Sequence, residues 1–354
     1  MSVTKSPLAP GVSTVPQPPL GRPPGSRNAL RAAGLAVSLL VLLAVVVLSI
    51  GFGARTLSLG EVWHGLLDHD SSAYTVVHRM RLPRTLLGLL AGAALGLAGG
   101  VMQALTRNPL ADPGLMGINA GASAAVASAA SFLGVTAFSG YVWFALAGAG
   151  VVAALLYLVG GGRGATPARL ALAGAALNAT LYSYVSAVML LDTASLDKMR
   201  FWTVGSLADA QPATVVKVLP FVAAGLLLAL ALARPLNALA LGDDSARALG
   251  ARPALTRSAA IVAVTLLCGA ATAACGPIVF VGLMVPHFVR ALTGPDLRWL
   301  LPYCAVLAPV LLLGADVLGR VLGSPGELQV GIVTTVLGGP LFLCFVRRGK
   351  AVRA

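Results

Sequence analysis

The stretch ALALGDDSARALGARPALTR, from Ala238 to Arg257, is a polar island between two long apolar runs. Asp243 or Asp244 can cap a helix start, and either charge suits the positive end of the helix dipole. Gly250 can end that helix in the left-handed conformation, and Pro253 fits the first turn of a second helix. The stretch therefore predicts a helix of barely two turns, a sharp turn and another helix, where two membrane spans meet water. An ordinary polar loop is the competing interpretation of these residues alone.

Composition places the rest of the chain in a membrane. Of its 354 residues, 57% are hydrophobic and 10% are charged, and the mean hydropathy is +0.88. Soluble domains carry about 25% charged residues, so a soluble globule of this length could not bury so much apolar side chain. The net charge of +13 is scattered over short loops, which fits orientation in a membrane better than binding to nucleic acid.

Apolar runs outward from the polar island predict an all-α bundle of ten transmembrane helices. Residues Met1 to Asn28 are rich in Pro, Ser and Gly, so we expect a disordered tail over 1–28 and one membrane domain over 29–354. The first run, Ala32–Gly53, is long enough to cross ~30 Å of hydrocarbon, whereas Ile278–Val289 is short and could be re-entrant. The other runs are Thr85–Leu105, Leu115–Val135, Tyr141–Gly160, Ala168–Leu191, Ala213–Ala233, Ser258–Ala274, Leu300–Val317 and Val330–Phe345.

The distribution of Lys and Arg sets the orientation. With ten spans both termini share a side, which then holds 17 of the 25 basic residues and leaves 8 on the other. Nine spans would put the basic C-terminus outside, against the positive-inside rule. We therefore expect both termini and the 242–257 stretch to be cytoplasmic.

Motifs for chemistry are absent from the sequence. There is no GxxxxGK[ST] phosphate-binding loop and no HExxH zinc motif, and the four cysteines form no CxxC pair. Asp243 and Asp244 could suggest the acidic motif of a membrane prenyl transferase, but no second acidic cluster accompanies them. We expect no catalytic residue, cofactor or metal site, and no ATP hydrolysis by this chain itself.

Asp316 is the one acidic residue expected inside a span, and such residues can mark ion pathways. It precedes Arg320 by one helical turn, so a local ion pair is the simpler interpretation. This favours a transporter that is not driven by ions. An ion-coupled secondary transporter and a membrane enzyme acting on lipid or isoprenoid remain the alternatives.

A stripe of small residues runs along the second predicted span, at Gly88, Gly92, Gly96 and Gly100. One glycine every four positions lies on one helical face and lets another helix come close. The stripe predicts tight helix packing.

Five segments, in order, carry a family resemblance. They are RLPRTLLGLLAGAALGLAGGVMQALTRNPLADPGLMGINAGA (81–122), ALGDDSARALGARP (240–253), GPIVFVGLMVPHFVR (276–290), ADVLGR (315–320) and GELQVGIVTTVLGGPLF (326–342). Together they resemble the FecCD-type permeases, which are the membrane subunits of ATP-binding-cassette (ABC) importers for iron-siderophore complexes, haem and cobalamin. The resemblance covers about Ala32 to Arg348.

The resemblance implies a permease in the bacterial plasma membrane, most simply for a ferric siderophore, with haem or cobalamin as alternatives. Its partners would be a second permease subunit (a copy or a paralogue), a dimer of cytoplasmic ABC ATPases and an external solute-binding protein. In this family two short coupling helices lie between the sixth and seventh spans, where they meet the ATPase. The coupling residues implied here are Gly242, Asp243, Asp244, Ser245, Arg247, Leu249, Gly250 and Pro253.

Two further sets of residues follow from the resemblance. Arg81, Arg84 and Arg320 correspond to arginines that meet acidic residues of the binding protein; anchoring at the membrane interface, or for Arg320 the pair with Asp316, is the alternative. A wide translocation path would suit polar side chains that could equally bond their own helix backbone. The path candidates are Asn178, Ser183, Ser186, Thr334 and Thr335.

Overall fold

The fold was analysed in a computed structural model, which describes residues 24–53, 57–71, 73–135, 137–160, 167–191 and 202–351. Within these ranges the secondary structure is helical and contains no strand. The elements are α1 (Pro24–Gly51), α2 (Leu59–Leu67), α3 (Tyr74–Val76), the π-helical turn η1 (Val77–Arg81), α4 (Leu82–Thr106), α5 (Ile118–Leu133), α6 (Phe138–Gly160), α7 (Pro167–Leu191), the 3-10 turn η2 (Trp202–Val204), α9 (Pro212–Ala231), α10 (Ala233–Ala240), α11 (Asp243–Ala248), α12 (Pro253–Cys275), α13 (Val281–Thr293), α14 (Leu297–Leu322) and α15 (Val330–Ala351).

Long apolar helices make up most of the described chain. Seven are long and apolar enough to cross a membrane: α1, the continuous α3–η1–α4 rod, α6, α7, α9, α12 and α14. The apolar parts of α5, α13 and α15 are shorter. Each predicted run falls on one of these helices, so the all-α membrane bundle is confirmed, and the number of spans stays a prediction.

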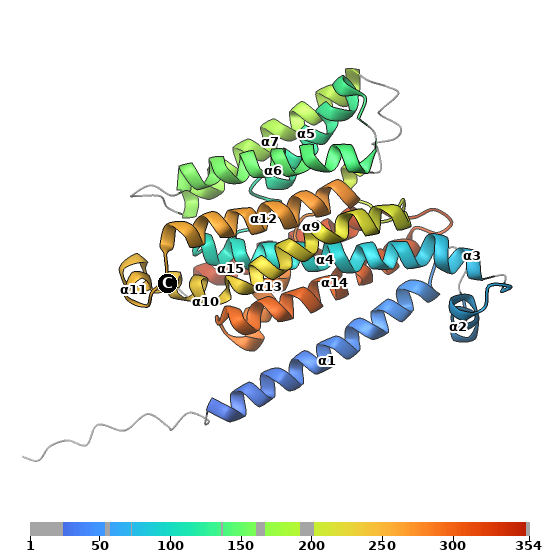
Figure 1. Cartoon of the computed structure of the whole chain (residues 1–354), viewed down its shortest axis with the longest axis horizontal. Helices are drawn as coiled ribbons and strands as arrows, with labels where there is room; N and C mark the ends of the chain where they lie inside the picture. The colour runs from blue at the N-terminus through green and yellow to red at the C-terminus, as the bar shows by residue number, and fades with distance from the viewer. Residues whose placement is uncertain are drawn as a thin grey trace, which may run out of the picture.

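Helix α4 lies at the centre of the bundle and is 78% buried over its most apolar window. It packs against α14 and α12, while α5, α6 and α7 form a group on one side (Figure 1). Helix α1 runs along the opposite side, and only 17% of its apolar window is buried. The core is therefore formed by α4, α12 and α14, and α1 is a peripheral helix.

The glycine stripe of α4 faces α14, as its spacing predicts. A Cβ atom at Gly92 would lie 2.6 Å from the Cα of Pro309, and one at Gly96 would lie 2.7 Å from the carbonyl oxygen of Cys304. Real Cβ atoms do not come so near to backbone atoms, so only glycine allows this approach. Close packing is confirmed for the stripe.

Two boundaries differ from the expectation. Helix α1 begins at Pro24, so residues 24–28 of the expected tail are helical, and residues 1–23 lie outside the described part. Helix α13 has 13 residues and follows a non-helical segment, 276–280, that ends at Phe280 with a φ of 70°. Thirteen helical residues span about 20 Å, less than a bilayer core, so whether this part of the chain crosses the membrane or re-enters stays open, as the sequence left it.

The two ends of the bundle differ. Helices α10 and α11 lie at the end where α1 begins and α15 finishes, and α2 and α3 lie at the opposite end (Figure 1). We call these the hairpin end and the outer end. The start of α1 and the end of α15 thus lie at the same end of the bundle, and the side of the membrane that this end faces stays a prediction.

Candidate functional site

The polar island folds as a helical hairpin at the hairpin end. Helix α10 is followed by the short helix α11, whose N-cap is Gly242 at a φ of 105°. No side chain caps α11, and Asp243 and Asp244 occupy its first turn instead. The prediction that one of these aspartates is the cap was wrong, because the sharp entry needs a conformation that only glycine adopts easily.

Gly250 ends α11 as the sequence predicts. Its φ is 80°, its N–H donates to the Arg247 carbonyl at 2.9 Å, and the N–H of Ala251 donates to the Ala246 carbonyl at 2.9 Å. These two bonds satisfy the last carbonyls of the short helix. Pro253 then starts α12, so the order of helix, turn and helix is confirmed.

Asp243 fastens the hairpin to the bundle. Its carboxylate accepts from Arg257 of α12 at 2.6 Å and lies 3.4 Å from the Arg107 guanidinium at the end of α4. The hydrogen bond from Arg257 is the main cause that holds the pKa of Asp243 below its usual value. Asp244, by contrast, has a fully exposed side chain and pairs only with Arg247 of its own helix. The two neighbouring aspartates thus have different roles: one anchors and one faces water.

Helix α10 is fastened separately to the start of α14. The Asn237 amide donates to Asp296 at 2.7 Å and accepts from the backbone N–H of Leu297 at 3.1 Å. The Arg298 guanidinium donates to both Asp296 oxygens, and this is the main cause that lowers the pKa of that carboxyl to about 2. The hairpin is therefore attached to three core helices: α4, α12 and α14.

Two leucines project from this hairpin. Leu241 and Leu249 are each 66% exposed, and a Cβ at Gly242 or Gly250 would meet no atom within 4 Å. Exposed leucines on a polar, fixed hairpin are typical of a protein contact surface. The geometry makes this hairpin the best candidate for coupling to a partner.

At the outer end, charged side chains form a buried network between α4 and α14. Arg84 donates to both oxygens of Asp316 at 2.8 to 3.2 Å and to Glu327 at 2.7 Å, and Arg320 pairs with Asp316 at 2.9 Å. Asp316 is fully buried. The predicted Asp316–Arg320 pair is present, and Arg84 is a third member that the sequence did not reveal.

The expected exposure of the outer arginines is wrong. Arg81, Arg84 and Arg320 are 6%, 9% and 5% exposed, respectively. Arg81 donates to the carbonyls of Ile50 and Gly51, each at 2.6 Å. Because these guanidinium groups bond within the subunit, they are not open rim charges, which was the basis for assigning them to docking.

Arg320 also bonds the end of α1. Its Nη1 donates to the Ser49 carbonyl at 2.9 Å and to the Phe52 carbonyl, and its Nη2 donates to the Ser49 hydroxyl. The last carbonyls of a helix lack partners within that helix and carry partial negative charge. Arg81 and Arg320 together therefore satisfy the C-terminus of α1.

The path candidates divide between exposed and buried positions. Ser183 and Ser186 on α7 and Thr335 on α15 are exposed, whereas Thr334 is 1% exposed. The hydroxyls of Ser186, Thr334 and Thr335 each donate to a carbonyl of their own helix. Backbone bonding, the alternative weighed for these residues, is thus observed for three of them.

Asn178 differs from the other path candidates. It lies against the turn that begins α5: a Cβ at Gly117 would stand 3.1 Å from the Asn178 backbone nitrogen. Its side-chain oxygen is buried and has no hydrogen-bond partner among the described residues. Unlike the hydroxyls of Ser186, Thr334 and Thr335, this oxygen is not engaged by the backbone of its own helix.

A second buried polar region escaped the sequence analysis. Asp112, 2% exposed, accepts from the Leu115 N–H at 2.9 Å, and Asn119, 1% exposed, donates to the Ile278 carbonyl at 3.0 Å. Gln103 of α4 accepts from Arg290 of α13 at 3.1 Å. Asn119 thus ties the start of α5 to the non-helical segment before α13, and the Gln103–Arg290 bond ties α4 to α13. An acidic residue just after RNPLA, at a helix break, was the available signal.

Metal coordination finds no support in the described ranges. No group of three or more His, Cys, Asp or Glu side chains is placed to hold a metal ion there. Cys268, Cys275 and Cys304 are buried free thiols, and Cys344 is exposed.

The apolar helices and the anchored, leucine-bearing hairpin at one end define the class of polytopic membrane proteins. The chain matches the FecCD transport family over residues 40–348, and it belongs to that family.

Three permeases are similar in sequence to this chain over nearly its whole length. It is 46% identical to the ferric enterobactin transport system permease protein FepD of Escherichia coli (strain K12), over 92% of this chain and 98% of that protein. It is 36% identical to the Fe(3+)-citrate import system permease protein YfmD of Bacillus subtilis (strain 168), covering 92% and 98%. It is also 36% identical to the hemin transport system permease protein HmuU of Yersinia pestis, covering 89% and 96%.

One solved structure is close in fold. It is an inward-facing conformation of a metal-chelate type ABC transporter, with a TM-score of 0.77 and 29% identity, covering 90% of this chain and 99% of that chain.

Proposed function

We propose that this chain is the membrane subunit of an ABC importer that carries a ferric siderophore into the cytoplasm. The observation that carries the proposal is its likeness, over nearly the full length of both proteins, to a ferric enterobactin permease. The fold supports it, because the chain has a membrane bundle and an exposed hairpin suited to contact a partner. The chain also lacks a phosphate-binding loop of its own. ATP hydrolysis would therefore take place on a separate ATPase subunit.

The hairpin is the proposed ATPase contact. Its two exposed leucines would enter an apolar cleft, and its anchors to α4, α12 and α14 would transmit movement of the ATPase to the core. The proposed coupling residues are Gly242, Asp243, Asp244, Ser245, Arg247, Leu249, Gly250 and Pro253. This role puts the hairpin end, with both termini, on the cytoplasmic side, in agreement with its excess of Lys and Arg.

Two permease subunits would enclose the path, and one external binding protein would dock on the outer end. Arg81, Arg84 and Arg320 lie at that end but are buried within the subunit, so they would support the docking surface from below.

The path would run beside α7 and α15, with Asn178, Ser183, Ser186, Thr334 and Thr335 as the candidate polar residues. Large chelates need a wide passage, which two subunits can form and one cannot. The domain assignment, with the permease over 29–354, belongs to the same proposal.

Haem or cobalamin is the second candidate substrate class, favoured by the likeness to a hemin permease. Reconstitution in vesicles with the cognate ATPase and binding protein would decide between the classes. We expect ATP-dependent uptake of a radiolabelled ferric catecholate siderophore and much slower uptake of haem and cobalamin. Faster uptake of haem or cobalamin would reverse the assignment, and uptake driven by a proton gradient without ATP would refute the importer.

A further inference from the structure

A cavity of about 340 Å³ lies between the start of α1 and the start of α14, at the hairpin end. Its lining residues are Asn28, Leu35, Arg298, Trp299 and Pro302. No part of the transport proposal uses it.

Helix geometry explains why the cavity exists. Asn28, Arg31 and Leu35 share one face of α1 and turn toward α14. The Tyr303 hydroxyl donates to the Arg31 carbonyl at 2.6 Å, where Gly34 leaves room for the tyrosine ring. This contact holds the two helices together, and on the hairpin side of it the short Asn28 side chain leaves a gap beside Trp299. Asn28 and Arg298 are exposed, so the cavity opens on the surface of the bundle.

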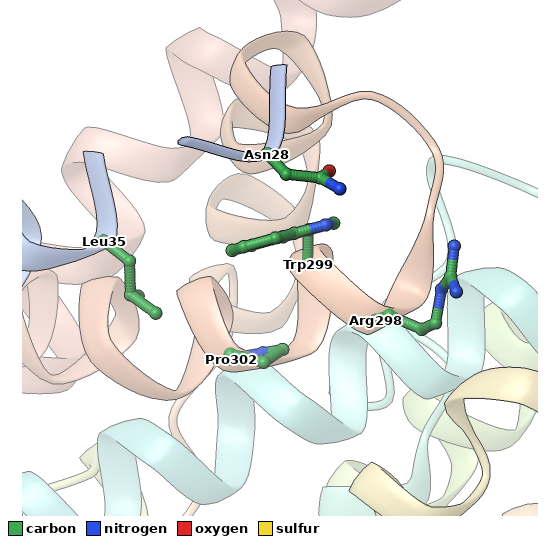
Figure 2. A pocket seen from close by; sticks show the side chains of 5 residues that line it. All are labelled: Asn28, Leu35, Arg298, Trp299 and Pro302. Atoms are coloured by element: carbon green, nitrogen blue, oxygen red, sulfur yellow. The ribbon is translucent and has the colours of Figure 1, made fainter. Parts of the chain in front are cut away.

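The cavity has a polar side and an apolar side. Figure 2 shows the Asn28 amide above the Trp299 indole, whose nitrogen edge points toward the side where Arg298 lies, with Leu35 on the opposite side. Amide, indole N–H and guanidinium are hydrogen-bond donors, and the guanidinium is charged at every physiological pH. Leu35 and Pro302 offer only hydrocarbon.

Charge at this position is net positive. The Arg298 side chain is 60% exposed and uses Nε and Nη2 on Asp296, which leaves Nη1 without a partner in the described part of the chain. The Arg31 guanidinium lies beside Gly294, 3.5 Å from where a Cβ of that residue would stand, and it has no acidic partner among the described residues. Arg298 is thus paired with one carboxylate, whereas Arg31 adds a second positive charge beside it.

The Arg298 guanidinium is already held in place without a ligand. Asp296 holds the Arg298 fork and is itself held by Asn237 of α10, so the guanidinium does not have to be ordered on binding. Preorganised donors lose less entropy when they bind.

We propose that this cavity is a binding site for one anionic phospholipid of the surrounding membrane. Its phosphate lies at the donor edge formed by Asn28, Trp299 and Arg298, and an acyl chain runs along Leu35 and Pro302. A tryptophan and an arginine at the level of the headgroups, above an apolar wall, match the two parts of such a lipid. The leaflet, which would be the cytoplasmic one, rests on the proposed orientation; the site itself does not.

Binding can be measured on the purified full-length protein without transport, so a failure here is separate from a failure of the importer proposal. Native mass spectrometry and thermal unfolding in detergent would be recorded with phosphatidylglycerol, phosphatidylcholine or glycerol 3-phosphate. We expect retention of one phosphatidylglycerol and a raised melting temperature, and neither effect with the other two.

Arg298→Gln should weaken phosphatidylglycerol binding about tenfold, as loss of one charge-assisted hydrogen bond does. Asn28→Leu should weaken it as well, by filling the cavity. Arg169→Gln, which removes an arginine from α7 on the far side of the bundle, is the matched control and should change nothing. Equal binding of phosphatidylcholine, an equal effect of glycerol 3-phosphate, or unchanged affinity in both cavity variants would overturn the proposal.

Discussion

The Arg84 guanidinium of α4 grips the Asp316 carboxylate of α14 through three hydrogen bonds of 2.8 to 3.2 Å, across 232 positions of the chain. Arg320 reaches the same carboxylate from one turn further along α14. Asp316 is therefore shared between two buried cations, and both of its oxygens are used. We therefore expect Asp316 to be structural, because its carboxylate serves as the counter-charge of two buried guanidinium groups.

Asp316→Asn should destabilise the protein by about 3 to 5 kcal/mol, since it removes the carboxylate that pairs with buried Arg320 and leaves Arg84 with Glu327 alone. Thermal unfolding in lipid nanodiscs measures the change. Glu327→Gln is the matched control: it also removes a partner of Arg84, but one that is partly exposed, so the cost should be about 1 kcal/mol or less.

The Asp316→Asn molecules that do fold should retain transport that depends on ATP and ignores an uncoupler. Uptake in vesicles at constant ATP checks this. If the uncoupler stops uptake by the unmodified protein, Asp316 regains a role in ion coupling and the ABC mechanism fails.

Gly250→Val should abolish ATP-driven transport while leaving insertion and dimerisation intact. Gly250 has a φ of 80°, where a β-branched residue is strained by about 1 to 2 kcal/mol, so the end of α11 would rearrange. Gly250→Asn is the matched control, because asparagine tolerates the left-handed region and should retain most transport. Equal transport by the two variants would remove the hairpin from the coupling role.

Asp243→Asn should reduce ATPase-coupled transport severalfold, whereas Asp244→Asn should have little effect. The first aspartate anchors the hairpin to α12 and the second faces water. The ratio of substrate imported to ATP hydrolysed is the direct readout. A larger defect at Asp244 would instead indicate that it contacts the ATPase itself.

The same anchor has a defined pH window. The folded-state pKa of Asp243 is lowered, so its stabilising contribution is complete above about pH 4, the ordinary aspartate value, and is lost only as pH falls through the lowered pKa. Any loss of transport between pH 7 and pH 5 should therefore be the same in the unmodified protein and in Asp243→Asn. A loss present only in the unmodified protein would show that the anchor titrates higher.

Gly92→Ala should cost about 1 to 3 kcal/mol, because the new methyl group would meet the backbone of Pro309. Gly314→Ala on the facing helix is the matched control, since a Cβ there meets no atom within 4 Å. Melting temperatures of the two variants in the same detergent provide the comparison. Similar values would show that the α4–α14 contact can widen without cost.

Much of the fold could be predicted from the sequence, because apolar length and turn residues are local signals. The hairpin illustrates the limit of such signals. Gly250 and Pro253 were predicted correctly as the end of one helix and the start of the next, whereas the aspartates were predicted as the N-cap of α11 in place of Gly242. A glycine cap has no side chain to mark it, and only the backbone angle reveals its role.

The outer arginines could not be interpreted from local sequence for a different reason. Burial of Arg84 depends on a carboxylate 232 positions away, and the sequence around Arg84 does not indicate that this carboxylate lies beside it. The position of Arg84 two residues inside α4 was the one available sign, since a charge within a span needs a partner. Asp112 and Asn119 were missed because they lie just before and just after the start of α5. A search for apolar runs does not locate the non-helical segments between helices.

The capping of α1 has a consequence for how the molecule is made. Arg81 leaves the ribosome soon after α1, but Arg320 follows only when nearly every other helix has been synthesised. Before α14 is made, the outer end of α1 keeps its bonds to Arg81 and Thr85 but lacks those to Arg320, so its final position is reached only when α14 packs against it. Nascent chains stopped before Arg320 should leave the outer turn of α1 open to cysteine labelling at Ser49→Cys, and chains stopped after it should protect that position.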